Sequence, residues 1–559
     1  MATVESVPAV TEAGVAPSGA IATAARAFGD AYPAVTGQRA VRVAGVVLVV
    51  ATALYVPWML SSLNRSVPWL AWPFAVTNLF TLATGLLAVF NAWWRAAPEP
   101  RPLRRGVEPA VAVIITACGE PVSMILRTVV SVLDQDWPLD RLLVVVSDDG
   151  HDPSLESALE PYPVLYHSPP PRFAPGRDGA AKAGNLNSAL AMVDERFPDV
   201  DFIETRDADD ELGSNGFLRQ VVGQLQAHER LAFVQTIKEA QVSAGDPFNN
   251  REGIFYRGQM LARNASNAVF PCGSGVVWRR SALRDIGNFP TWNLVEDLQS
   301  GVEALCRGWD SIYLPIVGAV GQHSPEDVPN VYKQRGTWAI DTVRLIVWRG
   351  LSGMGLRQKA QFLELLFFYL SSFTVLVYVP TLCLALLGWA PLDSDATGFL
   401  TRMLPIVVAT ETWLLVLNQP YNDRRKKQRQ KYRALWRVRT MWVGLAPVFM
   451  KASLQAILNG PNKKPVYKVT RKTHVHAWHW RQTLPQTTIV LSVVAVAIYA
   501  VRFQTLPNPI LLVGTVYWGG LNVVLLSSFI TRSWHGLTRT GKSIASATSE
   551  TEPRAAPAA

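Results

Sequence analysis

Residues 141–150, RLLVVVSDDG, join a short apolar run directly to two aspartates. An apolar, β-branched run of this length that ends in turn residues predicts a buried strand. Similar runs predict further strands, with helical stretches between them, at 111–117, 201–206, 231–237 and 311–317. Strands that alternate with helices are typical of a mostly parallel sheet covered on both faces. The sequence therefore predicts an α/β domain over residues 100–330.

Carboxylates follow two of these predicted strands. Asp148 and Asp149 end one strand, and Asp207, Asp209 and Asp210 follow another in the run IETRDADDE. Ligands of parallel sheets bind at the carboxyl ends of the strands. An Asp-x-Asp there can hold a hard divalent cation, commonly one shared with phosphates. The simpler alternative is two solvated turns whose aspartates cap the next helix.

Three other short segments carry candidate chemistry. Glu296 and Asp297 precede a helical segment, where a carboxylate is either a helix cap or a general base. The run KAGNLN at 182–187, which includes Lys182 and Asn185, opens a helix after a Gly-rich loop and suits an anionic ligand. The small residues of Cys272-Gly273-Ser274 predict a close approach of the backbone.

The composition indicates a membrane protein with a soluble part. Of 559 residues, 17% are charged and 49% hydrophobic, which excludes a disordered, fibrous or nucleic-acid-tail protein. A membrane span needs about 20 mostly apolar residues. Six apolar runs predict spans at 43–62, 69–94, 365–389, 403–418, 488–501 and 510–530. The four cysteines lie far apart and predict no disulfide framework or zinc cluster.

Charge predicts the orientation of these spans. The net charge is +10, and arginines and lysines gather before the first span and after the second, fourth and sixth. Positive segments stay in the cytoplasm, so both termini and the α/β domain are expected there, in a multi-pass protein of the plasma membrane. The basic run 422–433 is explained by this topology better than by nucleic-acid binding. Glu411, inside the fourth span, is expected to face protein or a wet cavity.

Two further segments predict amphipathic helices at the membrane interface, 331–348 and 435–458. The domain boundaries that follow are a disordered tail at 1–40, spans at 41–95, the α/β domain at 100–330, interfacial helices at 331–360, spans at 361–420, a cytosolic loop region at 421–485, spans at 486–532 and a disordered tail at 533–559.

The ordered set of segments resembles the processive, membrane-embedded family 2 glycosyltransferases, above all the bacterial cellulose synthase catalytic subunit. The resemblance implies a Rossmann-like GT-A domain inserted among about six transmembrane helices. It implies that Asp148 and Asp149 contact the nucleotide and that Asp207 and Asp209 hold Mg²⁺ or Mn²⁺ on the diphosphate. The other implied roles are donor binding by Lys182 and Asn185, catalysis by Asp297 as base beside Glu296, and acceptor contact by Cys272, Gly273 and Ser274.

Two more motifs of this family lie on the interfacial segments. Gln334 and Trp338 match a Gln-x-x-Arg-Trp motif, which implies donor binding and a ring on which the acceptor sugar stacks. Thr337 replaces the arginine of that motif, and Arg335 is a substitute that should point in another direction on a helix. The family's gating loop, which closes over the nucleotide, matches residues 467–472 and assigns Tyr467, Thr470 and Lys472 to the donor.

These likenesses predict an inverting, UDP-sugar-dependent polysaccharide synthase, cellulose-synthase-like, that moves its glycan across the membrane. The expected partners are UDP-glucose, a growing glycan or lipid acceptor, membrane lipids and accessory subunits, and no nucleic acid. The alternative is a non-processive enzyme that adds one sugar to a membrane lipid. A transporter or receptor that only binds nucleotide, and a catalytically impaired relative, are the other interpretations that these residues leave open.

Overall fold

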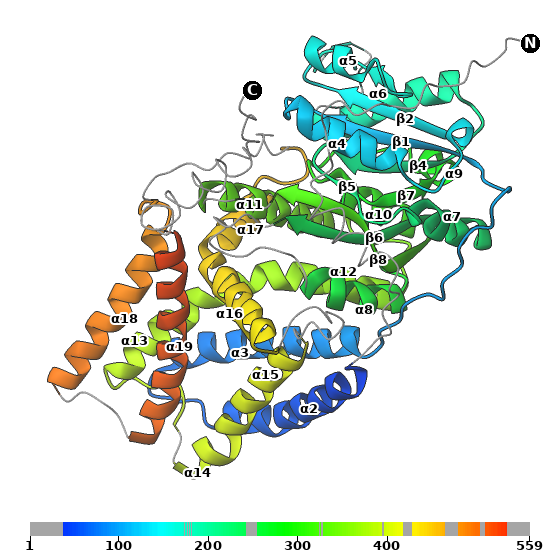
Figure 1. Ribbon diagram of the computed structural model, residues 1–559. Coiled ribbons are helices and arrows are strands. Elements are labelled where there is room, and N and C mark those ends of the chain that lie inside the picture. The colour runs from blue at the N-terminus through cyan, green and yellow to red at the C-terminus, as the bar shows by residue number, and fades with distance from the viewer. Residues whose placement is uncertain are drawn as a thin grey trace, which may run out of the picture.

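The chain folds into a sheet domain at one end and a set of long helices at the other (Figure 1). The computed structural model describes residues 37–172, 174–175, 177, 179, 181–241, 254–323, 325, 328–393, 396–417, 428–463, 479–503 and 509–533. The predicted tails at 1–40 and 533–559 therefore lie almost wholly outside the described residues, as does the first half, 422–427, of the basic run 422–433.

One eight-stranded sheet forms the centre of the α/β domain. Its strands, in spatial order, are β3 (Leu165–His167), β2 (Leu142–Asp148), β1 (Ala110–Ala117), β4 (Val200–Asp207), β7 (Val276–Arg279), β6 (Leu231–Gln241), β8 (Asp310–His323) and β5 (Glu211–Leu212). The five predicted strands are confirmed. The three that the sequence missed, β3, β5 and β7, are only two to four residues long, too short to show a periodicity.

The sheet is parallel from β3 to β4 and again between β6 and β8. β7 runs antiparallel to both of its neighbours, and β5 runs antiparallel to β8. The predicted mostly parallel sheet is thus confirmed, with β7 as a reversed strand in its middle. Because β1, β2 and β4 run the same way, their carboxyl ends meet at one edge of the sheet.

Helices cover both faces of this sheet, as predicted. Alternate residues of β1 point to opposite faces, so Val113 packs with one core cluster and Ile114 with the other. The helices of the domain are α4 (Val122–Leu133), α5 (Pro153–Leu159), α6 (Ala181–Arg196), α7 (Phe217–Ala227), α8 (Met260–Ala265), α9 (Arg280–Asp285) and α10 (Glu296–Cys306). α4 and α7 contribute to the first cluster, and α6, α8 and α9 to the second. The sheet is therefore a rigid support for the residues at its edge.

Five described helical segments are long and apolar enough to cross a membrane. They are α2 (Gln38–Ser61), α3 (Pro68–Ala92), the segment Leu356–Leu386 made of α12 (Leu356–Leu370) and α13 (Val375–Leu386), the segment Leu400–Leu417 that includes α15 (Leu404–Leu417), and α18 (Leu484–Arg502). They match the first five predicted spans, although the third begins earlier than predicted. The sixth predicted span lies in α19 (Pro509–Ser533), a single helix of 25 residues.

The connectors between these helices pair at two opposite ends of the bundle. At the end away from the sheet, Asn64 N donates to Pro391 O at 3.0 Å and Asp393 N donates to Ser62 O at 2.7 Å, around a bridge between Leu63 and Leu392. At the other end, Asn91 at the end of α3 donates to Ala360 O in α12 at 3.0 Å. Ala96 N there donates to Leu261 O in α8 at 3.1 Å. The α/β domain therefore sits where α3 ends and α12 begins.

The prediction of one amphipathic helix over 435–458 is wrong. The segment forms α16 (Gln428–Gly444) and α17 (Ala446–Leu458), bent by 50° at the break. Pro447 lies in the first turn of α17, where its missing N–H is tolerated, whereas inside a helix it would interrupt the hydrogen bonds. α17 packs on α11 (Val328–Arg344), and α16 packs on α19 (Figure 1).

Glu411 of α15 faces protein, as the sequence predicts. Arg439 of α16 pairs with it through both guanidinium ends, at 2.5 Å and 2.7 Å. The Glu411 side chain is 14% exposed. A bidentate pair of this kind fixes α16 against α15 and satisfies both charges.

Candidate active site at the strand ends

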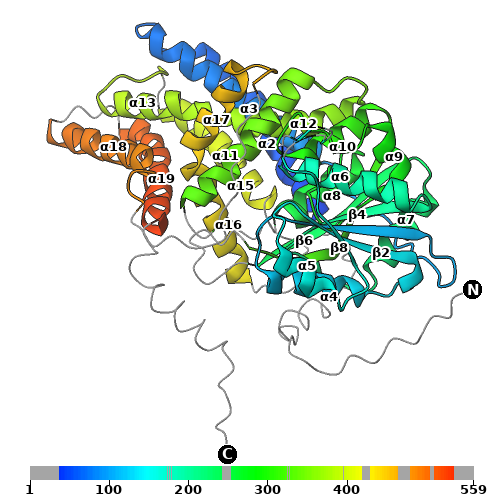
Figure 2. The ribbon, with the colours of Figure 1, turned by 90° about the horizontal axis from the view of Figure 1, so that it is seen from above.

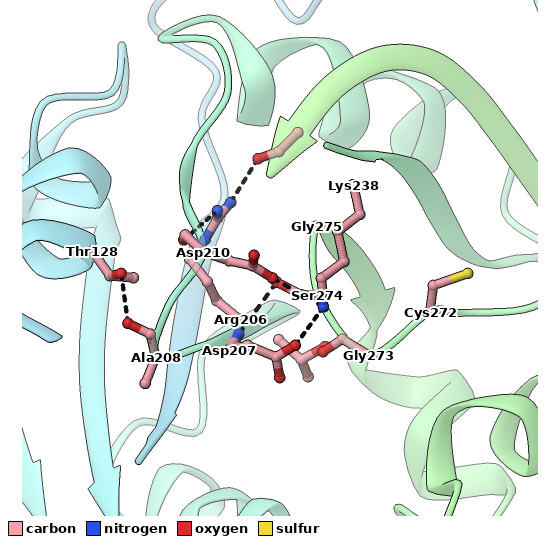
Figure 3. Close-up of polar contacts among 12 residues, drawn as sticks. Thr128, Arg206, Asp207, Ala208, Asp210, Lys238, Cys272, Gly273, Ser274 and Gly275 are labelled. Atoms are coloured by element: carbon pink, nitrogen blue, oxygen red, sulfur yellow. Dashed lines mark hydrogen bonds and ion pairs between the residues drawn. The ribbon is translucent and has the colours of Figure 1, made fainter. Parts of the chain in front are cut away.

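Asp207, the last residue of β4, lies between two lysines. Lys182, in the first turn of α6, contacts its Oδ1, and Lys238, on β6, lies 2.5 Å from its Oδ2. Lys238 also lies 3.0 Å from Asp210 Oδ2 (Figure 3). Burial would raise the pKa of Asp207, but the two ammonium charges outweigh it and hold that pKa below its usual range. The Asp207 carboxylate is therefore ionised at neutral pH and can act as an oxygen ligand of a cation.

The loop after α8 brings the backbone of Gly273 to the same point. Lys182 Nζ donates to Gly273 O at 2.8 Å. A Cβ built on Gly273 would lie 3.2 Å from both Lys182 Nζ and Asp297 Oδ2, and its φ of 80° favours glycine. Lys182 also lies 4.0 Å from Glu296. The structure thus gathers Lys182, Asp207, Gly273, Glu296 and Asp297, as the sequence predicts.

Glu296 and Asp297 open α10 and are both surrounded by protein. Burial, aided by the charge of Asp297, raises the pKa of Glu296 to about 7, although Lys182 opposes the shift. Burial likewise raises the pKa of Asp297. A general base works best when its pKa lies near the working pH. This pair therefore has the electrostatics expected of a group that accepts a proton at neutral pH.

Cys272 and Ser274 hold the shape of the loop beside this pair. Cys272 N donates to Gln235 Oε1 at 2.7 Å, and Asp207 N donates to Ser274 Oγ at 3.2 Å. Burial raises the pKa of the Cys272 thiol to about 12, so the thiol is neutral. In Figure 3 its sulfur points away from Asp207. Cys272 has the properties of a neutral wall of the site and not of a nucleophile.

α11 fixes the segment that leads into α10. Asp341 Oδ2 accepts hydrogen bonds from Leu294 N at 2.8 Å and from Val295 N at 2.7 Å. Arg344 donates to Trp292 O at 2.7 Å and lies over the Trp292 ring, 3.8 Å from its centroid. The position of Glu296 and Asp297, at the start of α10, therefore depends on α11.

The motif residues Gln334, Arg335 and Trp338 lie in the first part of the same helix. Arg335 lies over the Trp338 ring, 4.5 Å from its centroid, because residues three apart share a helix face. The hydroxyl of Thr337 donates to Lys333 O at 2.9 Å, within its own helix. Thr337 thus bonds to the helix backbone, whereas a cation at that position would be available to a phosphate.

The aspartates after β2 have partners of another kind. Asp148 accepts hydrogen bonds from Gly150 N at 2.8 Å and Asp152 N at 2.7 Å, which closes the turn after the strand. Asp149 pairs with Arg172 at 2.5 Å and with Arg177 at 2.6 Å. Both aspartates lie at the edge of the sheet where the strands end, as predicted. Their contact with the nucleotide stays a prediction.

The KAGN segment fastens α6 to that edge. Asn185 Nδ2 donates to Ser147 O at 2.9 Å, and Ser147 Oγ donates to Asn185 Oδ1. A Cβ on Gly184 would lie 2.0 Å from Gly179 O, so only glycine fits there. Asn185 therefore supports the strand ends from within, and its contact with the sugar donor stays a prediction.

Three predicted donor residues, Tyr467, Thr470 and Lys472, lie outside the described residues. The sequence in turn missed Lys238, Arg172, Arg177, Asp341 and Arg344. Lys238, inside the apolar strand LAFVQTIKEA, could have been predicted from the sequence to lie near carboxylates, because a buried ammonium needs carboxylate partners. The others lie in loops or on a helix where charges are common.

The carboxylates of Asp207 and Asp209 are suitable ligands for a divalent cation that arrives with a diphosphate. Among the described residues no group of three or more His, Cys, Asp or Glu is arranged to hold a metal ion. Asp207 and Asp209 are two carboxylates, and Mg²⁺ commonly takes one or two carboxylates, with phosphate oxygens and water as its other ligands. The low pKa of Asp207 means that no proton has to leave it first.

Comparison with known families identifies this domain. Residues 112–287 match the model described as glycosyl transferase family 2, and residues 203–392 match glycosyl transferase family group 2. Residues 112–287 are a family 2 glycosyltransferase domain. The match covers β1, β2, β4, β6 and β7, so it includes Asp149, Lys182, Asp207 and the Gly273 loop.

Curated relatives of this glycosyltransferase domain include cellulose synthases. The chain is 30% identical over 320 residues to cellulose synthase 2 of Novacetimonas hansenii, which is 54% of this chain and 19% of that protein. It is 28% identical over 345 residues to the UDP-forming cellulose synthase 1 catalytic subunit of Komagataeibacter xylinus, 58% of this chain and 44% of that one. The alignments thus span less than half the length of these relatives.

Among solved structures, the glycosyltransferase chain is similar to the mannosyltransferase PcManGT of Pyrobaculum calidifontis, determined with GDP-Man and Mn²⁺. The two share 19% identity at a TM-score of 0.47, over 69% of this chain and 99% of the other.

Proposed function

We propose that the chain is an inverting, metal-dependent polysaccharide synthase that transfers sugar from a UDP-sugar to a growing glycan. The donor that we propose first is UDP-glucose. The observation that carries this proposal is the convergence of Lys182, Asp207, Glu296 and Asp297 around Gly273. The site thus combines cations for a diphosphate with a buried carboxylate pair that accepts a proton. The cellulose synthases among the relatives support a glycan product.

In this mechanism Asp297 takes the proton of the acceptor hydroxyl, because burial raises its pKa and so makes it a stronger base than an ordinary aspartate. Asp341 and Arg344 hold the start of α10, so the base keeps its orientation. Lys182 binds near the departing diphosphate. Asp207 and Asp209 would hold a Mg²⁺ or Mn²⁺ ion, which would supply Lewis-acid stabilisation of the charge on that diphosphate. Trp338 offers its ring to the acceptor sugar.

The long helices serve, in this proposal, to carry the product. A polar glycan cannot cross the hydrocarbon core unaided, so spans that enclose a path would couple synthesis to export. The pairing of the 62–64 and 391–393 connectors at one end, with the α/β domain at the other, supports the predicted cytoplasmic position of the domain. A cysteine replacing Arg65 should react with an impermeant reagent from outside, and one replacing Asp140 only after permeabilisation.

The test of the function is the size of the product. The purified chain, given a panel of UDP-sugars and a divalent cation, should release UDP and form a long chain whose linkage can be analysed. A single sugar on a lipid would instead establish the non-processive alternative. Asp297→Asn should abolish UDP release, whereas Asp201→Asn, at an exposed aspartate of β4, should leave it intact. UDP release that survives in Asp297→Asn would contradict the assigned base.

A further inference from the structure

Lys238 occupies a place that the proposed reaction leaves unexplained. Its ammonium lies 2.5 Å from Asp207 Oδ2, and Lys182 contacts Oδ1 of the same carboxylate. Both oxygens of this predicted metal ligand are thus already bonded to cations. Figure 3 shows Lys238 reaching from β6 toward Asp207 and Asp210.

The burial of Lys238 excludes an incidental surface contact. Its side chain is 5% exposed, and in β6 it directly follows Ile237, a buried residue of the second core cluster. An ammonium in such surroundings is stable only with carboxylate partners, because its lost hydration must be replaced. Asp207 provides one partner and Asp210, at 3.0 Å and fully buried, provides a second.

Two partners give Lys238 an alternative position. If Asp207 turns an oxygen to another ligand, the ammonium keeps Asp210, and neither charge is left alone. Lysine suits this exchange better than arginine, since its ammonium is a compact charge on a flexible stem. This exchange explains why Asp210 is buried beside Lys238 and lies so near Asp207 in the sequence.

We propose that Lys238 is a positioning residue that keeps Asp207 occupied until a divalent cation arrives together with a nucleoside diphosphate. A free divalent cation that approaches Asp207 meets two ammonium groups and is repelled. A cation already bound to a diphosphate carries no net positive charge, and the phosphate oxygens of the complex can accept hydrogen bonds from the same lysines. The site would thereby reject free metal and accept the metal–nucleotide pair. This inference rests on the proposed metal-dependent function.

Binding of Mn²⁺ to the full-length chain in detergent, followed by electron paramagnetic resonance without nucleotide, tests the proposal. Wild-type protein should bind free Mn²⁺ weakly, and Lys238→Met should bind it at least about tenfold more tightly, because one repelling charge is gone. Lys238→Arg, which keeps the charge, should resemble wild type. Lys451→Met, at an exposed lysine of α17, is the matched control.

A second pair of variants ties the effect to this site. Asp209→Asn in the Lys238→Met background should return Mn²⁺ binding to the weak level. Asp210→Asn should weaken binding of Mn²⁺ with UDP, since Lys238 then keeps only Asp207, and this effect should vanish in the Lys238→Met background. Lys238→Gln keeps the test available if the methionine variant does not fold, as judged by its melting curve.

Two outcomes separate this proposal from the function on which it rests. If UDP binding depends on Mn²⁺ but folded Lys238→Met or Lys238→Gln binds free Mn²⁺ no more tightly than wild type, only the role of Lys238 is overturned. If wild-type protein binds UDP equally with and without Mn²⁺, the metal-dependent function is overturned, and the role of Lys238 with it.

Discussion

The strands β2 and β4 belong to one sheet and both end in aspartates, yet different partners hold those aspartates. After β2, backbone amides hold Asp148, and the guanidinium groups of Arg172 and Arg177 hold Asp149. After β4, lysines hold Asp207. A guanidinium is a rigid fork with fixed geometry, whereas an ammonium is a point charge that moves easily. The comparison indicates that Asp148 and Asp149 are held in fixed positions, whereas Asp207 can exchange its partners.

The largest expected effect contrasts Asp207 with Asp148. Asp207→Asn should lower kcat by about 10²–10³-fold, since it removes charge stabilisation at the reacting diphosphate. Asp148→Asn should chiefly lower the free energy of unfolding, by about 1.5–3 kcal/mol, because charge-assisted bonds to the turn are lost. Steady-state kinetics and melting curves on both variants measure the contrast. A raised KM without a stability loss in Asp148→Asn would favour its predicted nucleotide contact instead.

The second prediction concerns pH and the carboxylates that face Asp207. Burial raises the pKa of both carboxylates, that of Glu296 to about 7. The carboxylate form that accepts the proton is therefore lost at a higher pH than in an ordinary Asp or Glu, and transfer should decline on the acidic side of neutrality. Glu296→Gln removes a neighbouring negative charge, which should lower the pKa of Asp297 and move the acid limb to lower pH. A pH–rate profile that is identical in both proteins would contradict this coupling.

The third prediction tests whether α11 acts on the site through position alone. Asp341→Asn weakens the two bonds to Leu294 N and Val295 N. We expect kcat to fall about tenfold with little change in KM for the donor, since a small displacement of the base affects the reaction step most. Asp341→Glu, which restores the charge, should recover part of the rate. A purely structural role would lower stability and leave the ratio of kcat to KM unchanged.

The smallest expected effect belongs to Thr337, whose hydroxyl now bonds to Lys333 O. Thr337→Arg supplies a fork for phosphate oxygens, and charge-assisted hydrogen bonds contribute about 1.5–3 kcal/mol when well formed. UDP-sugar binding, measured by calorimetry, should therefore tighten, to an extent limited by the lysines already present. Unchanged affinity would mean that this position does not reach the diphosphate.

Local patterns predicted most of this fold, and the misses have physical causes. Long apolar runs predicted five strands and the spans, because burial on both faces leaves a continuous signal. β7 escaped because VVWR is only four residues long, and its antiparallel direction depends on distant neighbours. At the site, sequence predicted the carboxylates at strand ends but not Lys238, whose partners are 28 and 31 residues away in the chain. The predicted gating-loop residues, 467–472, lie outside the described residues.

The small bridge between Leu63 and Leu392 has a mechanical consequence. Its backbone bonds join the α2–α3 hairpin to the connector that follows α13, and α2 also packs tightly on α15. These helices are thus joined to one another at the end far from the sheet. We therefore expect them to move together, and α18 and α19 to move more readily than they do. A disulfide engineered across positions 63 and 392 should leave transfer unchanged, whereas, under the proposed export of the glycan, one that joins α13 to α18 should block delivery of the product across the membrane.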